Sequence, residues 1–464
     1  MLLRLGIDIA CRAAHQVSLA DEQGRFIWTG RRFRTRPEDL IRLWSMLPEG
    51  ADPADVLVVM EPTRNAWVPL AAWFRRHGAK VFLVPPERSA DLRRYYAKHS
   101  KTDRLDSQLL ARLPMLHPDG LYAEQSLGPG DALKRAAKLH STLTHRRSQS
   151  LARLDALLEI LGPAWHTAIG TDLANRTPLK FLAAGYADPY VVKRLGRTRL
   201  ARFCYRHSRG AWGEPHADAL LAAASETLEL WSGGELDYPD LAEDIAIEAR
   251  LALQLTEEIK DLDQRTALLL QQADPLGILT SAPGVAAITA AAILGRLGDP
   301  NRFHSLAGAR AFTGLVPTLD SSGLTNRHGG PTKRGDAVLR QALFMAAGQA
   351  RRIDPTLAAK YQRLMIDAGK HHNSALCHIA TTLLTRIIAC WRTGQPYVLR
   401  DVDGAAVTIE QARVIIAERY AVPKDLRARR RATADTRTDR RSKESPSAPS
   451  TGPSNRNATT PQAA

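Results

Sequence analysis

Four carboxylates in the first quarter of the chain are the residues best suited to chemistry. Asp8 lies inside an apolar segment, Glu61 follows the apolar run VLVVM, and Asp103 and Asp106 are three residues apart, so that they share one face of a helix. An unpaired carboxylate inside an apolar strand is costly, which favours a functional role for Asp8. Four converging carboxylates repel one another unless divalent cations neutralise them. Two Mg²⁺ or Mn²⁺ ions roughly 3.5–4 Å apart would support phosphodiester chemistry at such a site.

The elements that must position these carboxylates are predicted in the order of a ribonuclease H-like (RuvC-like) domain over residues 1–125. Three short strands are followed by helix, strand, helix, strand and helix. In that fold the first and fourth strands are neighbours, so Asp8 and Glu61 would project side by side, and the last helix would bring Asp103 and Asp106 across their ends. In chain order, the predicted ranges are 3–9, 15–19, 26–33, 37–47, 56–60, 67–77, 80–84 and 102–113.

A basic and aromatic segment comes directly before the acidic pair. Cationic side chains are suited to gripping a phosphate backbone, and tyrosine rings are suited to stacking on bases. A solvated basic face is the alternative interpretation of the same segment. The candidate nucleic-acid-binding residues are Arg93, Arg94, Tyr95, Tyr96, Lys98 and Lys101, with Lys333 and Arg334 further along the chain.

The charge of the chain points to a polyanionic partner. Its 464 residues include 64 Lys and Arg against 48 Asp and Glu, which gives a net charge of +16 and a pI near 10. Nucleic acid is the simplest partner for such a protein. Residues 424–464 are rich in Ser, Pro, Thr and Ala, carry six of the sixteen charges and are predicted to be disordered, so residues 1–423 keep +10.

Composition also argues against several classes of protein. Four cysteines without a CxxC pair indicate a reduced, cytoplasmic protein without a structural zinc site. The longest apolar run, Val285–Leu294, is far shorter than the roughly 20 residues of a membrane span, and the N-terminus lacks a secretory signal. A group formed by His371, His372, Cys377 and His378 lacks a second ligand pair, which favours a polar helix N-terminus over a zinc site.

From about residue 126 the strand patterns give way to helical ones. Residues 126–275 are predicted to be a helical coiled-coil region that carries an inserted helical subdomain at about 162–235. Its apolar seam must be buried against something, and a second copy of the chain is the simplest partner, so we expect a homodimer or tetramer. The seam consists of Leu255, Ile259, Leu262, Thr266 and Leu269.

A third, helical unit is predicted over residues 276–395, followed by a short extension over 396–423. It opens with Ser281–Val285, which is either a helix–hairpin–helix-like element that could hold a phosphate or an ordinary Pro-Gly turn. A loop rich in Gly, Ser and Thr is predicted over 319–335.

Several short motifs occur in an order that resembles one family of enzymes. Together they resemble the transposases of the insertion sequence 110 family, the bridge-RNA-guided DEDD recombinases, over about residues 1–125 and 276–395. The middle region is longer than in that family, Ala286 replaces a usual glycine, and the basic tail is an addition. The motifs are Gly6-Ile-Asp8, Met60-Glu61-Pro-Thr63, Lys101-Thr-Asp103-Arg-Leu-Asp106, Ser281-Ala-Pro-Gly-Val285, Arg302-Phe, Ala311-Phe-Thr-Gly-Leu-Val-Pro317, Ser321-Ser-Gly323 and Thr332-Lys-Arg-Gly335.

The resemblance implies a serine recombinase with a composite active site. The four acids would hold Mg²⁺, while Ser322, with Ser321 as second choice, would attack the DNA and form a covalent 5′-phosphoserine. The implied partners are the insertion-sequence ends, the target DNA, a bridge RNA and further subunits, in the nucleoid of a bacterium. The residues alone leave open a metal-dependent ribonuclease H-like nuclease or Holliday-junction resolvase, and a non-catalytic nucleic-acid-binding protein, for which Asp8 would be unexplained.

Overall fold

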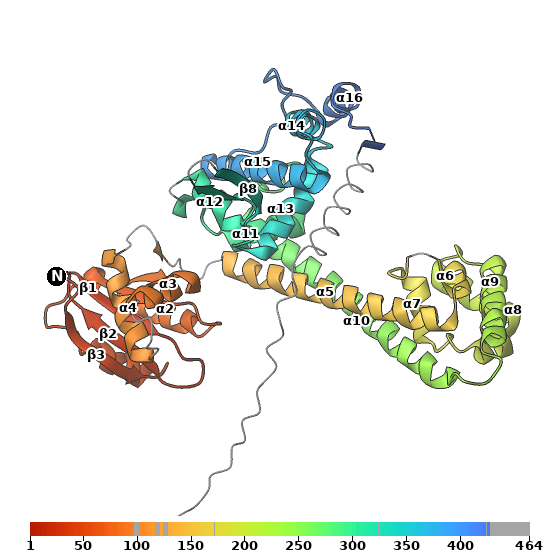
Figure 1. The fold of residues 1–464 in the computed structure, drawn as a ribbon, viewed down its shortest axis with the longest axis horizontal. Coiled ribbons are helices and arrows are strands. Elements are labelled where there is room, and N and C mark those ends of the chain that lie inside the picture. The colour runs from red at the N-terminus through yellow and green to blue at the C-terminus, as the bar shows by residue number, and fades with distance from the viewer. Residues whose placement is uncertain are drawn as a thin grey trace, which may run out of the picture. The chain divides into compact units, whose positions relative to one another are not determined.

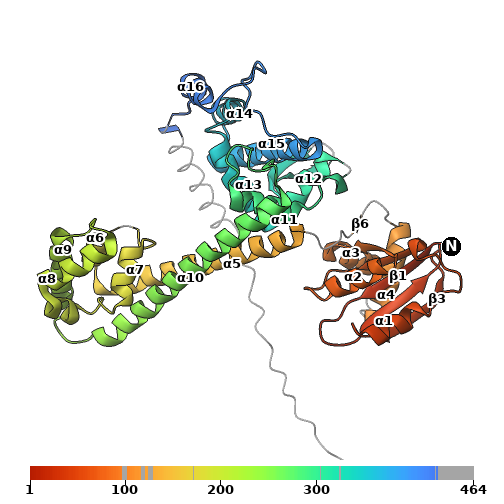
Figure 2. The same ribbon diagram turned by 180° about the vertical axis from the view of Figure 1, so that it is seen from behind.

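The computed structural model describes residues 1–96, 102–116, 121–123, 129–170, 172–303, 305–322, 325–423 and 425–426. These belong to two compact units, residues 1–131 and 132–464. The first is a mixed α/β unit and the second is mostly helical (Figures 1 and 2). The fold class is therefore an α/β N-terminal part joined to a helical remainder, as predicted.

A mixed six-stranded sheet, in the order β3-β2-β1-β4-β5-β6, organises the first unit. The first three strands form an antiparallel meander, β4 and β5 run parallel to β1, and β6 closes the edge in the antiparallel direction. The predicted neighbourhood of the first and fourth strands is confirmed. The strands are β1 (Leu3–Asp8), β2 (His15–Ala20), β3 (Phe26–Phe33), β4 (Val56–Met60), β5 (Lys80–Leu83) and β6 (Tyr122–Ala123).

Three of the four α-helices described within this unit lie where the sequence predicts them: α1 (Pro37–Trp44), α2 (Trp67–Arg76) and α4 (Asp103–Leu116). The fourth, α3 (Pro86–Tyr96), was not predicted, because its basic and aromatic composition hides its helical pattern. The two-residue strand β6 was missed as well, since so short an edge strand has no pattern of its own.

Alternation along β1 separates the core from the functional face. Leu5 and Ile7 are buried with residues of α1 and α2 on one face of the sheet. Gly6 points to the other face, where a Cβ atom would lie only 2.2 Å from the carbonyl oxygen of Ser107, so glycine lets α4 approach the sheet. Because side chains two apart on a strand share a face, Asp8 lies on the α4 side with Gly6.

Two long antiparallel helices, α5 (Pro129–Leu161) and α10 (Tyr238–Ala273), run side by side in the second unit (Figures 1 and 2). Polar contacts join them along their length: His140 to Asp263 at 3.2 Å and Arg147 to Thr256 at 2.8 Å. Their far end carries the insert, a four-helix subdomain whose core also includes residues of α5 and α10. Its helices are α6 (Ala164–Ile169), α7 (Arg176–Ala183), α8 (Pro189–Ser208) and α9 (Glu214–Leu230).

The predicted seam on α10 is covered within the same chain. Leu255, Leu262 and Thr266 are buried in the isolated chain, and Ile259 and Leu269 are partly buried. The inference that this stripe needs a second copy was therefore wrong, because α5 and α11 (Ala287–Leu297) already lie along α10. The seam gives no support to a particular oligomeric state.

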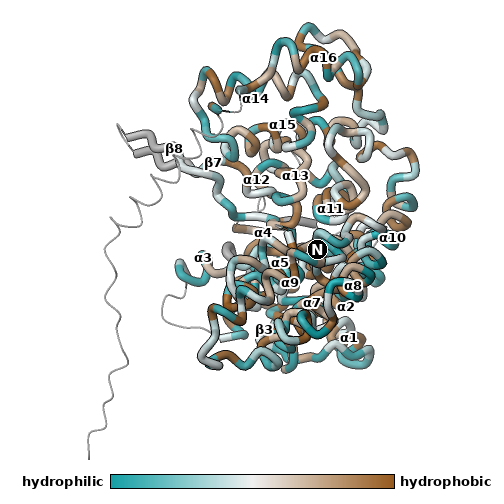
Figure 3. The backbone as a smooth tube through the Cα atoms, turned by 90° about the vertical axis from the view of Figure 1, so that its right-hand side faces the viewer, coloured by the Kyte–Doolittle hydropathy of each residue, from teal (hydrophilic) through white to brown (hydrophobic). Residues whose placement is uncertain are grey.

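The C-terminal part of the second unit has the largest apolar core of the described chain, to which α11 and the later helices contribute. Hydrophobic residues recur along these helices (Figure 3). The further elements are α12 (Leu306–Thr313), β7 (Pro317–Ser322), β8 (Thr325–Pro331), α13 (Ala337–Ala350), α14 (Pro355–Met365), α15 (His372–Thr393) and α16 (Ile409–Arg419).

The hairpin of β7 and β8 contradicts the predicted loop over 319–335 and the expectation that strands end near residue 126. Cross-strand hydrogen bonds between the two segments supply an order that their Gly-, Ser- and Thr-rich composition does not reveal.

The Pro-Gly turn before α11 packs tightly: a Cβ on Gly284 would lie 2.4 Å from the carbonyl oxygen of Ala346. This close contact with α13 favours a packing role for the turn over phosphate binding.

Helix α15 is the single described helix whose length and apolarity would allow it to cross a membrane. Its apolar side chains are instead part of the core, since Ile379, Leu383 and Ile387 are almost completely buried. We interpret α15 as a core helix, and it gives no reason to expect a membrane partner.

Candidate active site

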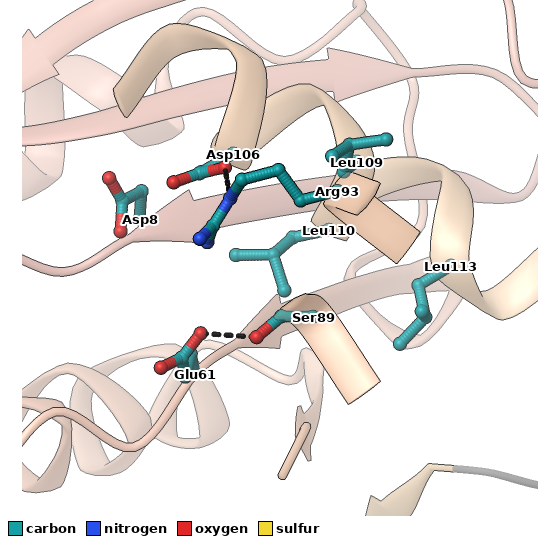
Figure 4. A pocket seen from close by; sticks show the side chains of 8 residues that line it. All are labelled: Asp8, Glu61, Ser89, Arg93, Asp106, Leu109, Leu110 and Leu113. Carbon is teal, nitrogen blue, oxygen red and sulfur yellow. Dashed lines mark hydrogen bonds and ion pairs between the residues drawn. The ribbon is translucent and has the colours of Figure 1, made fainter. Parts of the chain in front are cut away.

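Three of the four predicted carboxylates line one small pocket on the α4 side of the sheet (Figure 4). Asp8 is the last residue of β1, and Glu61 directly follows β4. The parallel register pairs Ile7 with Met60, so the two acids that come next lie at the same edge of neighbouring strands. Asp106 enters from the first turn of α4. The remaining lining residues are Ser89, Arg93, Leu109, Leu110 and Leu113.

Asp103, the fourth predicted acid, begins α4 and is exposed. It does not line the pocket, but its charge acts on Asp8. The pKa of Asp8 is raised to about 6, first by burial and then by repulsion from Asp106, Asp103 and Glu61, while Arg93 opposes the rise. The charges of Asp103, Asp106 and Glu61 therefore all act on Asp8.

Two side chains of α3 hold two of these acids. The hydroxyl of Ser89 donates to Oε2 of Glu61 at 2.5 Å, and Nε of Arg93 donates to Oδ1 of Asp106 at 2.6 Å. Ser89 and Arg93 are four residues apart, so they lie on the same face of the helix. In Figure 4 the guanidinium of Arg93 lies among the three carboxylates.

Sequence reasoning missed Ser89 and gave Arg93 a different role. Arg93 was predicted to bind nucleic acid, whereas in the structure it is three-quarters buried and paired with Asp106. The usable signal was the four-residue spacing of Ser89 and Arg93 after Pro86, but it requires first recognising that residues 86–96 are a helix.

The oxygen donors of this pocket suit a hard divalent cation such as Mg²⁺. Burial beside like charges, which raises the pKa of Asp8, is the condition that a bound cation would relieve. In the part of the chain that the structure describes, however, no three such side chains are gathered closely enough to hold a metal ion. Asp106 is hydrogen-bonded to Arg93 and Glu61 is hydrogen-bonded to Ser89. These side chains must therefore move before the acids can share one cation.

The predicted serines lie in the second unit. Ser321 and Ser322 end β7, and Ser322 pairs with Thr325, the first residue of β8, while Gly323 lies outside the described residues. The structure thus places the serines at the end of a hairpin and the acids in a separate unit.

The base of this hairpin is anchored by two of the sequence motifs. A Cβ on Gly314 would lie 2.6 Å from the carbonyl oxygen of Arg334, and one on Gly335 would lie 2.5 Å from that of Phe312. The backbone after β8 is therefore pressed against the end of α12, and Arg340 donates to the carbonyl oxygen of Lys333 at 3.1 Å. Gly314 and Gly335 belong to the motifs Ala311–Pro317 and Thr332–Gly335, so both motifs contain close packing contacts that position the hairpin.

The other candidate nucleic-acid contacts are only partly described. Arg94 and Tyr95 are exposed on α3, and Tyr96 is its last residue, whereas Lys98 and Lys101 lie outside the described residues. Lys333 and Arg334 are exposed beside the hairpin, so they are accessible to a ligand.

Comparison with known proteins identifies relatives of both units. A family model described as "Transposase IS116/IS110/IS902 family" matches residues 276–362, and a second, described as a transposase, matches residues 5–163. The insertion element IS110 43.6 kDa protein of Streptomyces coelicolor is 30% identical over 361 residues, which cover 74% of this chain and 83% of the relative. The insertion element IS116 44.8 kDa protein of Streptomyces clavuligerus is 23% identical, with 81% and 91% covered.

Proposed function

The chain belongs to the IS110 family of insertion-element transposases, and from this we propose that it cuts and rejoins DNA by metal-assisted attack of Ser322. A transposase of this family acts on the DNA ends of its insertion sequence. The observation that supports metal-assisted catalysis is the pocket that Asp8, Glu61 and Asp106 share, together with the effect of the Asp103 charge on Asp8. We further propose that a bridge RNA guides the enzyme to its target.

The first unit is proposed to be a ribonuclease H-like (RuvC-like) domain. Its support is the strand order, the parallel pairing of β1 with β4 and the position of an acid at the end of each of these strands. The side chains of Asp8, Glu61, Asp103 and Asp106 would hold Mg²⁺ or Mn²⁺. When bound, the cations would neutralise the phosphodiester and favour the ionised form of the attacking hydroxyl.

The proposed reaction conserves the energy of the phosphodiester. The hydroxyl oxygen of Ser322 forms a bond to phosphorus, the bond from phosphorus to the 3′ oxygen breaks, and the proton lost by the serine balances the one gained by the 3′ oxygen. A 3′ hydroxyl of the partner strand then attacks the phosphoserine and releases the serine. No ATP is required, and the sequence contains no GxxxxGK[ST] loop.

Because the acids and Ser322 lie in different units, we propose that one subunit supplies the acids and another the serine. An Asp8→Asn protein mixed with a Ser322→Ala protein is then expected to regain activity that each lacks alone. Random dimers would restore roughly a quarter of the wild-type rate, since half of them are mixed and each has one complete site. DNA cleavage by the mixture measures this.

The matched control mixes Asp8→Asn with Glu61→Gln, since both changes are in the same unit. Such mixtures should stay inactive whatever the arrangement of subunits. If co-purified mixed oligomers of Asp8→Asn and Ser322→Ala show no cleavage, each site is assembled within one chain.

A second prediction concerns the guanidinium that lies among the acids. Replacing Arg93 by Gln removes a cation that competes for Asp106, so we expect Mn²⁺ to bind about tenfold more tightly. This gain, about 1.4 kcal/mol, is a third of the roughly 4 kcal/mol between opposite charges about 4 Å apart near a protein surface. Mn²⁺ binding to the full-length protein can be followed by electron paramagnetic resonance or calorimetry.

Arg94→Gln is the matched control for this measurement. Arg94 is the next residue of α3, is exposed, and pairs with Asp91 at 3.4 Å on the outer surface of the helix. Its replacement changes the net charge equally and should leave Mn²⁺ affinity unchanged. Equal affinities of the two variants would show that Arg93 does not compete with the metal.

A further inference from the structure

One helix of the insert carries a concentrated positive charge that the catalytic proposal does not use. The segment 189–213, which consists of α8 and the turn after it, has seven Lys and Arg and no Asp or Glu. A backbone break at Gly196, with φ 70° and ψ 170°, separates a short first part of α8 from the second part. Most of the charge lies after this break.

Helical spacing gathers three of these arginines on one face of α8, and a fourth directly follows the helix. Arg199, Arg202, Arg206 and Arg209 follow one another at steps of three, four and three residues, and all four are exposed. We call them the arginine stripe. A different face of α8, which includes Leu200 and Cys204, is completely buried in the core of the insert.

The fold of the insert does not account for the stripe. Arg197, on the same helix, pairs with Asp218 at 2.6 Å and with Glu214 at 2.9 Å, and so joins α8 to α9. No carboxylate of the described residues pairs with any member of the stripe. Like charges three and four residues apart destabilise a helix, and only the last two gain from the negative C-terminal end of its dipole. The stripe is therefore better explained by an external anion.

The positive surface continues onto the neighbouring helix α7. Nζ of Lys180 lies 3.4 Å from Nδ1 of His207. The pKa of His207 is lowered by partial burial and by repulsion from Lys180, Arg206 and Arg176, which shows that cations of both helices lie close together. A ligand on the stripe would thus meet additional positive charge at its side.

We propose that the arginine stripe binds the phosphate backbone of duplex DNA, independently of base sequence. The stripe runs over ten residue steps, from Arg199 to Arg209, or about 15 Å at 1.5 Å per helical residue. A DNA strand presents one phosphate per about 3.4 Å along the axis, so a segment of this length offers about four phosphates to the four arginines. Contacts of this kind position a protein on DNA without reading its sequence.

Other polyanions fit the observations less well. Family membership establishes DNA as a ligand of this chain, whereas RNA is part of the proposal above. A helix that binds a lipid surface must expose an apolar face, but the apolar face of this one is inside the insert. The insert would therefore provide an additional DNA-binding surface, made of residues other than the proposed catalytic ones.

The test compares two variants of the full-length protein with equal net charge. In the stripe variant all four arginines become Gln; in the control variant Gln replaces four arginines that are ion-paired in the structure, Arg25, Arg153, Arg197 and Arg250. Binding to a labelled duplex DNA without insertion-sequence ends is measured between about 50 and 200 mM salt. This readout involves no cleavage, so it is independent of the metal and of Ser322.

The stripe variant is expected to show a slope of log K against log salt that is less steep by about 3 to 4, from about 0.9 for each lost phosphate contact. The control variant should keep the wild-type slope. A variant with all four arginines changed to Lys retains the charge and should restore binding, which excludes misfolding as the cause. Equal slopes for the stripe and control variants would overturn the proposal. So would a stripe variant that loses affinity for a duplex RNA of the same length but keeps its affinity for duplex DNA.

Discussion

Replacement of Asp8 by Asn is expected to abolish DNA cleavage, lowering its rate by at least about a thousandfold, or about 4 kcal/mol of activation free energy. Asn has nearly the same shape but lacks the charge that a divalent cation requires, so the proposed site would lose a metal ligand without a change in packing. Glu61→Gln, Asp103→Asn and Asp106→Asn should behave in the same way. Single-turnover cleavage of labelled insertion-sequence ends with Mg²⁺ or Mn²⁺ measures the effect.

Asp91→Asn provides the matched control, since Asp91 is an exposed acid of α3 that forms an ion pair with Arg94 of the same helix. Its cleavage rate should remain close to that of the wild type. Full recombination in excess EDTA would refute a role for divalent cations altogether.

Although Asp8→Asn is expected to abolish cleavage, we expect it to stabilise the folded chain. The pKa of Asp8 is raised in the folded chain to about 6, from an ordinary value of 3.8. The folded state therefore holds this proton more tightly than the unfolded state, and the resulting stabilisation, complete below about pH 4, is lost as the pH rises through 6. Without metal, Asp8→Asn should melt at a higher temperature than the wild type at pH 7.5, and the difference should shrink toward pH 4.

Thermal unfolding in EDTA at several pH values tests this expectation. Asp91→Asn should follow the wild-type profile, because Asp91 is exposed and lies on the outer surface of α3. An Asp8→Asn protein that is less stable than the wild type at pH 7.5 would show that the Asp8 carboxylate has favourable partners in the fold.

Replacement of Ser322 by Ala is expected to eliminate strand exchange and covalent protein–DNA adducts, while DNA binding persists. The hydroxyl is the proposed nucleophile, and an alanine at the end of β7 keeps the backbone pairing with Thr325. Adducts that survive denaturation can be collected on DNA substrates that trap the cleaved state, and mass spectrometry then locates the attached residue. No other measurement separates the proposed mechanism from its alternatives as directly.

Ser321→Ala, the change of the neighbouring residue, is the control. It should retain adduct formation, whereas an adduct found on Ser321 would transfer the nucleophile to that residue. Unchanged cleavage by Ser322→Ala and Ser321→Ala proteins, with no adduct, would identify a metal-dependent nuclease or junction resolvase that uses only the acids. A wild-type protein that binds DNA but never cleaves it would favour the non-catalytic alternative.

Local sequence patterns predicted most of the first unit because they depend on neighbouring residues in the chain. The alternation around Leu5 and Ile7 indicated β1 and placed Asp8 on it, and the apolar run before Glu61 indicated β4. Once strands and helices are in the expected order, few topologies remain, so the proximity of Asp8 to Glu61 could also be predicted. The sequence alone thus determined that Asp8 and Glu61 lie at the same edge of neighbouring strands.

Only the tertiary structure decided what else contacts them and which surfaces are covered. Arg93 pairs with Asp106 and Ser89 with Glu61 because α3 packs against α4 and reaches the residue after β4, and no pattern in the sequence records that packing. The seam at Leu255 shows the same limit: its periodicity predicts burial, but whether α5 of the same chain or another chain covers it depends on how the long helices return. Periodicity identifies the face of an element that must be buried, whereas the identity of its partner is a property of the whole fold.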